Sequence, residues 1–400
     1  MVHDIMKHIL KERPVGSKNN MDILLYLENL MVKMGYGIKK LPFTCTTCET
    51  GESCLILNDR RIEIQPSPFS QPFEGSGRLV FVESLEELET ANCQNRILVV
   101  GGELVTTPLQ PKEYPFYYPD EHKYLIELFE RKQPAAIIAA TGKHTLCGLQ
   151  PFPLFEDGNF LIPSAYVPEV MFEKLQGNDQ ERMARVFIQT KNKQQNSYQL
   201  VAQKRNKGSH GRIIVCAHMD TKYHTQGALD NAVGVAVLLE AAARLVNSNY
   251  NIDIVPFNGE EYYEASGEVE YLKYIRSGQD KVSLVINIDS PCHAGSQIAV
   301  SLYNFDDPAK EVVDQLMQTQ NEVVYGPEWY AGDHAAFAFR GIPCMVLTSS
   351  DLFEGGLDNT HTMRDTPDTV DLSQVELAAN YINQYITHDL FSHFSGNFRT

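Results

Sequence analysis

Two segments near the middle of the chain carry histidine and carboxylate side chains beside apolar runs. An apolar, strand-like run ends in His218, and Asp220 follows two residues later. Asp230 lies between Gly227 and Gly234, where a loop leads into an apolar, helix-like segment. Histidine nitrogens and carboxylate oxygens are ligands that zinc takes in hydrolytic enzymes. These two segments therefore predict part of a metal site.

Three later segments supply the same kinds of side chain. Glu260 and Glu261 follow an apolar run, Asp289 closes another, and His361 lies in a polar loop. Taken singly, Asp230 could cap a helix, the two glutamates could form an acidic first turn, and His361 could be a surface residue. Asp289 is harder to explain in this way, because an unpaired acid at the end of a buried strand is unfavourable. The joint occurrence of all these segments, in this order, predicts a metal centre.

Hydrolysis at such a centre needs more than ligands. Two zinc ions a few ångströms apart need a carboxylate that binds both, and the water between them becomes a strong nucleophile. Another carboxylate must accept the proton of that water and pass it on. The segments above contain carboxylates for both tasks, so the sequence predicts a hydrolase with two zinc ions per chain.

The elements that position these residues follow a regular pattern after residue 198. The expected strands are 198–202, 212–215, 252–257, 284–288, 298–302 and 343–347, and the expected helices are 232–246, 269–277, 309–320, 335–339 and 373–387. Such alternation predicts a three-layer α/β/α sandwich with a mostly parallel, mixed sheet. Functional residues of these sheets collect beyond the carboxyl ends of the strands, where each candidate ligand is expected. The first forty residues predict two helices and an edge strand at 37–42.

The region 45–197 has a different character, with many prolines and aromatic residues and short β-like runs. Its expected elements are strands at 55–57, 78–82, 96–100 and 135–140 and a helix at 122–131. No candidate site residue falls here. We interpret the region as a smaller α/β domain inserted into a discontinuous catalytic domain, which comprises residues 1–44 and 198–400.

Three cysteines at the start of this region form a separate pattern. Cys45 and Cys48 are spaced as CxxC, and Cys54 follows soon after. With a fourth ligand elsewhere they could form a small zinc knot. The alternative is that they are thiols in a polar turn, and the sequence leaves both interpretations open.

Charge and hydropathy limit the partners of this 400-residue chain. Its formal net charge of -17 argues against nucleic acid or an anionic membrane as a partner. No run approaches the about 20 apolar residues that a spanning helix needs. The N-terminus has no uninterrupted apolar core and no small-residue cleavage site, so a cytoplasmic location is expected unless a leader was removed. The aromatic run 114–118 fits either a homodimer contact or a contact between domains.

The candidate segments also form an ordered set of motifs. They are His218-Met-Asp220, Gly227-Ala-Leu-Asp-Asn-Ala-Val-Gly234, Asn258-Gly-Glu-Glu261, Asn287-Ile-Asp289 and His361-Thr-Met-Arg-Asp-Thr366. This set resembles the di-zinc exopeptidases of metallopeptidase family 28, a group of bacterial aminopeptidases, glutamate carboxypeptidases and glutaminyl cyclases. The resemblance is strong from residue 198 to about residue 372 and weak in the N-terminal helices.

The resemblance implies a role for each metal ligand. His218 and Asp289 would hold one zinc ion, and Glu261 and His361 would hold the other. Asp230 would bridge the two ions. The inserted region 45–197 also resembles, more weakly, the protease-associated domain that some members carry.

The resemblance further implies how the ligands are assisted. Glu260 would be the general base and then the acid that protonates the leaving amine. Asp220 would orient His218. The peptide bond between Asp230 and Asn231 would be cis.

The chain departs from the family beside the last histidine ligand. Several members place a tyrosine there that stabilises the oxyanion of the tetrahedral intermediate, and this chain has Thr360. Tyr330, His334 or His293 are candidates to replace it.

These features favour a zinc aminopeptidase that acts on small peptides. A free amino terminus needs acidic recognition, and several acids lie near the ligand segments, namely Glu264, Glu268, Glu328, Asp333 and Asp358. A carboxypeptidase of the glutamate-carboxypeptidase type would need a cation aimed at the substrate carboxylate, for which Arg364 is the candidate. A glutaminyl cyclase would be smaller and would lack the insertion. A scaffold protein that lost catalysis would have lost ligands, and here all of them are present.

Overall fold

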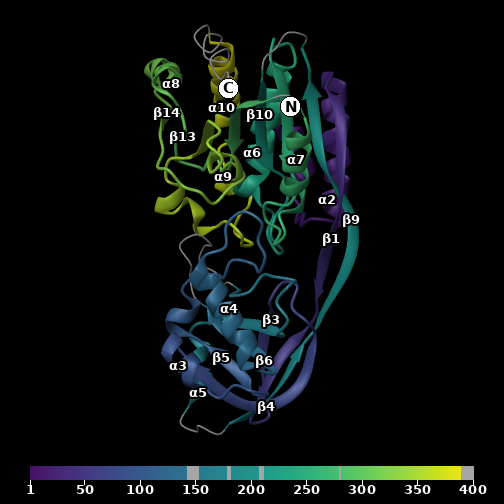
Figure 1. Ribbon diagram of the computed structural model, residues 1–400, viewed down its shortest axis with the longest axis vertical. Helices are drawn as coiled ribbons and strands as arrows, with labels where there is room; N and C mark the ends of the chain where they lie inside the picture. Colours follow the sequence, from purple (N-terminus) through teal and green to yellow (C-terminus); the bar gives the residue numbers. More distant parts are fainter. Residues whose placement is uncertain (142–152, 178–181, 207–210, 279–280, 389–400) are drawn as a thin grey trace. The chain divides into compact units, whose positions relative to one another are not determined.

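The computed structural model describes residues 1–141, 153–177, 182–206, 211–278 and 281–388. The chain divides into two compact units, whose elements are labelled in Figure 1. The sheet unit comprises Met1–Cys45 and Asn196–Thr400, and the barrel unit comprises Thr46–Gln195. These limits lie close to those expected from the sequence. Each unit has a hydrophobic core of its own.

The sheet unit is built on an eight-stranded sheet with the order β1-β9-β11-β10-β12-β15-β13-β14. The strands are β1 (Gly37–Thr50), β9 (Thr190–Lys204), β10 (Arg212–His218), β11 (Asn251–Phe257), β12 (Val282–Ile288), β13 (Ile298–Tyr303), β14 (Val323–Tyr325) and β15 (Cys344–Ser349). β10 pairs in parallel with β11 and β12, and β12 pairs in parallel with β15. β9 and β13 are antiparallel to β11 and β15. The carboxyl ends of the four central strands therefore meet at one edge of the sheet.

The central strands are buried along nearly their whole length. Every residue of β10, β11 and β15 is buried, as is every residue of β12 after Val282. Continuous burial of this kind is typical of parallel strands that helices cover on both faces. It also explains why these strands could be recognised from apolar runs in the sequence.

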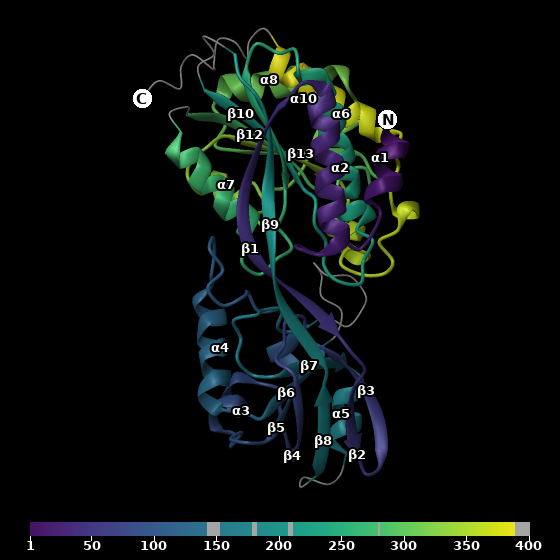
Figure 2. The ribbon, with the colours of Figure 1, turned by 90° about the vertical axis from the view of Figure 1, so that its right-hand side faces the viewer.

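Helices cover both faces of this sheet (Figure 2). They are α1 (Val2–Ile9), α2 (Lys18–Met34), α6 (Val233–Leu245), α7 (Ser266–Ser277), α8 (Asp307–Thr319), α9 (Ala335–Ala338) and α10 (Gln374–Thr387). Figure 2 shows α7 on one side of the sheet and α1, α2 and α6 on the other. On the α7 side, the ring of Tyr271 packs edge-on against Phe257 of β11, with 5.5 Å between ring centroids. The three layers confirm the predicted α/β/α sandwich.

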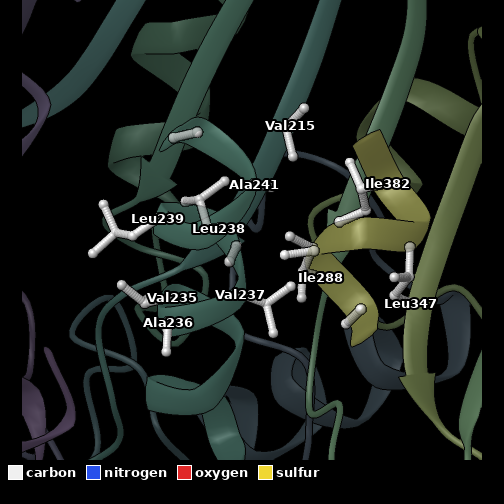
Figure 3. Close-up of a cluster of buried hydrophobic side chains, with 14 of the residues drawn as sticks. Val215, Val235, Ala236, Val237, Leu238, Leu239, Ala241, Ile288, Leu347 and Ile382 are labelled. Carbon is white, nitrogen blue, oxygen red and sulfur yellow. The ribbon is translucent and has the colours of Figure 1, made fainter. Parts of the chain in front are cut away.

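The largest core lies between α6, α10 and the sheet. Val215, Ile288 and Leu347 from three strands meet the apolar residues of α6 and Ile382 of α10 there (Figure 3). Each large aliphatic side chain that is buried in this way contributes about 1.5–3 kcal/mol. This packing fixes the start of α6, and the turn that precedes it, relative to the ends of β10 and β12.

The barrel unit has a different architecture. Its strands close into a barrel with the order β2-β3-β7-β6-β5-β4-β8. They are β2 (Ser53–Leu57), β3 (Arg60–Pro66), β4 (Phe73–Val82), β5 (Ile97–Val100), β6 (Ala136–Thr141), β7 (Ser164–Pro168) and β8 (Met183–Ile188), with helices α3 (Leu85–Thr90), α4 (Asp120–Lys132) and α5 (Met171–Gln176). The four strands expected from the sequence are β2, β4, β5 and β6. The closure was not predicted, because it depends on antiparallel pairs between distant segments, such as β2 with β8 and β3 with β7.

The cysteine pattern has a structural explanation that the sequence did not provide. Cys45 and Cys48 lie in β1, which is the edge strand as expected but continues to Thr50, and Cys54 lies in β2. All three are buried thiols in strands, so the interpretation as thiols is kept and their placement in a polar turn is wrong. Burial raises the pKa of Cys45 to about 12, which disfavours the thiolate that zinc binds. Within the described residues, no group with metal-ligand spacing includes a cysteine.

None of the helices in the described ranges is long and apolar enough to cross a membrane.

Candidate metal centre

The carboxyl ends of β10 and β12 bring the first candidate ligands together. His218 is the last residue of β10, and Asp289 directly follows β12. Asp230 lies in the short π-helical turn Ala228–Ala232 that precedes α6. His218 Nε2 lies 3.0 Å from Asp230 Oδ1 and 3.7 Å from Asp289 Oδ1. This group therefore consists of one imidazole nitrogen that faces two carboxylates.

A second group shares Asp230 with the first. Glu261 follows β11, and His361 lies in the loop after β15. His361 Nε2 lies 3.0 Å from Asp230 Oδ2 and 2.9 Å from Glu261 Oε1. The two oxygens of Asp230 thus face two different histidines, which is the arrangement that a bridging carboxylate needs.

The turn that carries Asp230 is held by Asp365. Its carboxylate accepts hydrogen bonds from the backbone amides of Leu229 (2.7 Å) and Asp230 (3.0 Å). Asp365 is buried, and this burial raises its pKa to about 6. The bond between Asp230 and Asn231 is a cis peptide, as the family resemblance implied.

Asn231 ties the same turn to the end of β12. Its side-chain amide donates to the carbonyl of Ile288 (2.8 Å), and its Oδ1 accepts from the amide of Ser290 (3.2 Å). Asp289 lies between these two residues. The positions of the Asp230 and Asp289 side chains are therefore set by one connected network.

Asp220 holds the turn that follows β11. Its Oδ1 accepts from the amide of Gly259 (2.9 Å), and its Oδ2 accepts from the amide of Glu261 (3.1 Å). It therefore positions the backbone on both sides of Glu260. His218 Nδ1 is buried and has no hydrogen-bond partner in the described part of the chain. The role of orienting His218, which the resemblance implied for Asp220, stays a prediction.

The pKa values of Asp230 and Glu260 are shifted in opposite directions. Burial alone would raise the pKa of Asp230, but hydrogen bonds with His218 and His361 hold it below its usual range. Burial raises the pKa of Glu260 well above its usual range; the charge of His218 opposes this, and that of Glu261 adds to it. Glu260 is partly exposed, and its carboxylate lies within 4.8 Å of ligand atoms of His218 and Glu261.

The donor atoms suit two zinc ions. Three groups have atoms within 4.8 Å of one another, namely His218–Asp230–Asp289, Asp230–Glu261–His361 and His218–Glu260–Glu261. Zinc takes imidazole nitrogen and carboxylate oxygen in this way. The carboxylates of Asp230, Glu261 and Asp289 are buried, and such a concentration of buried acids is favourable only when cations balance it. The residues that the sequence singled out as ligands therefore fit a dinuclear site.

Two contacts of the site were not found by sequence reasoning. Lys222 Nζ donates to the carbonyl of Glu261 (3.0 Å) and lies 3.4 Å from its Oε2. Asp365 belongs to the motif His361-Thr-Met-Arg-Asp-Thr366, but the sequence did not indicate its role. The signal for Asp365 is an acid four residues after His361; the contact of Lys222 depends on tertiary structure and left no signal.

The acids expected to recognise an amino terminus differ in their exposure. Glu268 and Asp333 are buried, and burial raises the pKa of both well above its usual range. They do not present a charge to a substrate at the surface, so this part of the prediction is wrong. Glu264 and Asp358 are partly exposed and Glu328 is exposed.

Thr360 stands next to His361, where several family members have the tyrosine that stabilises the oxyanion. Thr360 is buried, and its hydroxyl donates to the carbonyl of Leu357 (3.0 Å). The hydroxyl of Tyr330 donates to a neighbouring glutamate, His334 bonds a backbone carbonyl, and His293 pairs with an aspartate. In the part of the chain that the structure describes, each of these side chains already has a partner, so none is assigned the oxyanion role.

Comparisons with known proteins bear on the family and the fold. The family model of Peptidase family M28 matches residues 199–386. The fold is similar to that of an aminopeptidase from Aneurinibacillus sp. strain AM-1, with a TM-score of 0.74 and 17% identity over 96% of this chain and 92% of that chain. It is also similar to BSAP, a zinc aminopeptidase from Bacillus subtilis, with a TM-score of 0.72 and 18% identity over 96% and 93% of the two chains.

A third similar structure is a Peptidase M28 precursor from Shewanella amazonensis, with a TM-score of 0.69 and 17% identity over 100% of this chain and 92% of that chain. At these identities the likeness establishes the fold. A search of curated proteins gives no match.

Proposed function

We propose, from the premise that this chain belongs to Peptidase family M28 and is a metallopeptidase, that it is a zinc-dependent aminopeptidase that removes N-terminal residues from small peptides. The observation that carries the proposal is the position of Asp230. One of its oxygens faces His218 and the other faces His361, each at 3.0 Å. Two metal ions on either side of one carboxylate are what a dinuclear hydrolytic site requires.

The ligands would be divided between two ions. His218 and Asp289 would hold one zinc ion, Glu261 and His361 the other, and Asp230 would contact both. Bound zinc supplies a Lewis acid that polarises the peptide carbonyl and lowers the pKa of a water molecule. The protein contributes the rigid placement of these five side chains at the ends of parallel strands.

Glu260 is the proposed proton carrier. Its partial exposure lets it reach a substrate, and its carboxylate would accept a proton from the water and return it to the leaving amine. Asp220 supports this role, because it anchors the amides of Gly259 and Glu261 on both sides of it.

Arg364 is the cation on which the carboxypeptidase alternative depends, and one of its nitrogens is bound within the protein. A carboxypeptidase would need this guanidinium to bind the substrate carboxylate. In the structure it donates to the backbone carbonyl of Asp358 (3.2 Å). Glu264, which is partly exposed, and Glu328, which is exposed, are the acids that would recognise a substrate amine. Two of the similar structures are also described as aminopeptidases, one of them as a zinc enzyme.

The test compares substrates with free and blocked amino termini. A panel of aminoacyl chromogenic amides and N-acetylated peptides is assayed before chelation, after chelation and after zinc return. We expect cleavage of the free-amino substrates alone, lost on chelation and restored by zinc. Cleavage of only the blocked peptides would move the assignment to a carboxypeptidase, and cleavage that persists in the chelated protein would overturn the zinc-dependent mechanism.

A further inference from the structure

Arg13 is a fully buried arginine outside the groups described above. It lies in the segment between α1 and α2, and its side chain has 0% exposure. A buried guanidinium is unfavourable unless its donors are satisfied. In this structure they are satisfied by backbone carbonyls rather than by a carboxylate.

Three of the five carbonyls that Arg13 binds lie at the two ends of one loop, and the other two belong to Ile9 and Lys11. Its Nε donates to Met219 O (2.5 Å), immediately before Asp220. Its Nη1 donates to Gln226 O (2.6 Å), and its Nη2 donates to Gly227 O (3.0 Å), shortly before Asp230. A single side chain therefore fixes the distance between the end of β10 and the turn that precedes α6.

The main chain of Arg13 is held to the same region. Its amide donates to Thr221 Oγ1 (3.0 Å), and its carbonyl accepts from the side chain of Asn20 (3.2 Å). Asn20 also donates to Asn258 Oδ1 (2.8 Å), directly before the turn that carries Glu260. The N-terminal segment thus contacts the backbone of the loop before α6 and, through Asn258, the turn that carries Glu260.

Arg13 and Asp365 act on the Asp230 turn in complementary ways. Arg13 binds carbonyls at the start of the turn, and Asp365 binds the amides of Leu229 and Asp230. Burial lowers the pKa of Arg13 to about 10, and the nearby carboxylates of Asp365 and Asp220 oppose this shift. The guanidinium therefore remains charged at neutral pH.

We propose that Arg13 is a positioning residue of the metallopeptidase site, which holds Asp230 where its two oxygens meet two metal ions. This inference rests on the proposed function. It assigns a role at the site to the N-terminal segment, which contributes no ligand. The guanidinium fork is essential to the role, because its three nitrogens reach carbonyls on both ends of the loop, whereas a lysine has one nitrogen.

The test compares Arg13 with a matched buried arginine in the same unit. Arg212 is 3% exposed and begins β10, the strand that His218 ends, and its Nη1 lies 3.4 Å from Asp253. The variants are R13K, R13M, R212K and R212M. Zinc affinity is measured by competition with a chromophoric chelator, and kcat and KM are measured with an aminoacyl amide, below the unfolding temperature of each variant.

We expect both methionine variants to lose stability, and only R13M to lose metal affinity and turnover. Partners that orient metal ligands typically account for about 10–100-fold in affinity or activity, so R13M should bind its weaker zinc ion at least about tenfold less tightly. Its kcat should fall by about 100-fold with little change in KM, because misplaced reacting groups lose rate rather than binding. R13K should be intermediate, because it keeps the charge and loses the fork.

Outcomes that overturn this inference are separate from failure of the proposed function. Zinc affinity and kcat of R13M equal to those of R212M would show that Arg13 has only a structural role. If R13M does not fold, R13K decides: wild-type zinc affinity and kcat in R13K would overturn the inference. Absence of zinc binding and aminopeptidase activity in the wild-type chain would instead overturn the proposed function.

Discussion

Gly234 is a helical glycine whose replacement by alanine should destabilise the protein. It is buried near the start of α6. A Cβ built on it would lie 2.6 Å from Asn231 Cγ and 2.9 Å from Asn231 Nδ2, closer than side chains approach one another. Asn231 cannot move freely, because its amide is bonded to Ile288 O and to the amide of Ser290. The substitution therefore forces Asn231 out of the network that joins Asp230 to Asp289.

The magnitude follows from two opposing effects. In an exposed helix, glycine to alanine stabilises by about 1 kcal/mol. Here the displaced Asn231 leaves the buried carbonyl of Ile288 and the buried amide of Ser290 unpaired, which costs about 1–3 kcal/mol for each group. The two unpaired groups together cost about 2–6 kcal/mol, so after the helix gain G234A should lose about 1–5 kcal/mol in the free energy of unfolding. Zinc affinity should fall as well, because the turn of Asp230 shifts.

The assay is urea denaturation of the metal-free protein, followed by far-UV circular dichroism. A free energy of unfolding equal to that of wild type, or higher, would refute the reasoning. The control is the double variant N231A/G234A. If the clash with Asn231 is the cause, G234A should lower the free energy of unfolding little further in a chain that already carries N231A. The double-mutant cycle should then show a favourable coupling between the two sites.

Three further predictions concern the site and the barrel unit. E260Q should lower kcat/KM by about 10²–10⁴-fold. The protein should retain its zinc, as measured by elemental analysis. An E260Q variant with wild-type activity would show that another group carries the proton. Burial raises the pKa of Asp157 from 3.8 to about 6, so this group stabilises the fold below pH 4 and loses that contribution as the pH rises through about 6. D157N should therefore flatten the fall in unfolding free energy between pH 4 and 7, by up to about 3 kcal/mol, and a pH profile identical to that of wild type would contradict this. Trp329 is the only tryptophan, and a Cβ on Gly332 would lie 3.0 Å from its Cζ3 and 3.1 Å from Asp289 Oδ2. Cobalt(II) bound at the site should quench its fluorescence in the wild-type protein, and D289N should weaken this quenching; quenching that is unchanged in D289N would place the metal elsewhere.

The sheet unit could be predicted from the sequence because its signals are local. The run that ends in His218 is buried throughout, so it reads as an uninterrupted apolar segment. The next residues after such runs are those that reach the edge of a parallel sheet, which identified Asp289 and the pair Glu260 and Glu261. The structure brings these residues together, and their individual roles stay proposals.

Other features depend on contacts between distant parts of the chain and left no local signal. The barrel closes through pairs such as Cys54 with Phe187, which no short pattern encodes. The three cysteines have polar residues around them in the sequence, yet Cys45 and Cys48 are buried in β1 and Cys54 is buried in β2. Arg13 resembles an ordinary loop arginine, because its main partners lie more than 200 residues away and are backbone carbonyls.

The most direct test of the account is a zinc titration of the metal-free protein, with bound zinc and hydrolysis of an aminoacyl amide measured in the same samples. We expect two ions per chain in the wild type, with hydrolysis that rises as the site fills. In D230N, removal of the bridging carboxylate charge should weaken binding of at least one ion and abolish hydrolysis. Two ions bound equally tightly in D230N and in the wild type, or full hydrolysis by D230N, would contradict the central claim that Asp230 joins two catalytic metal ions.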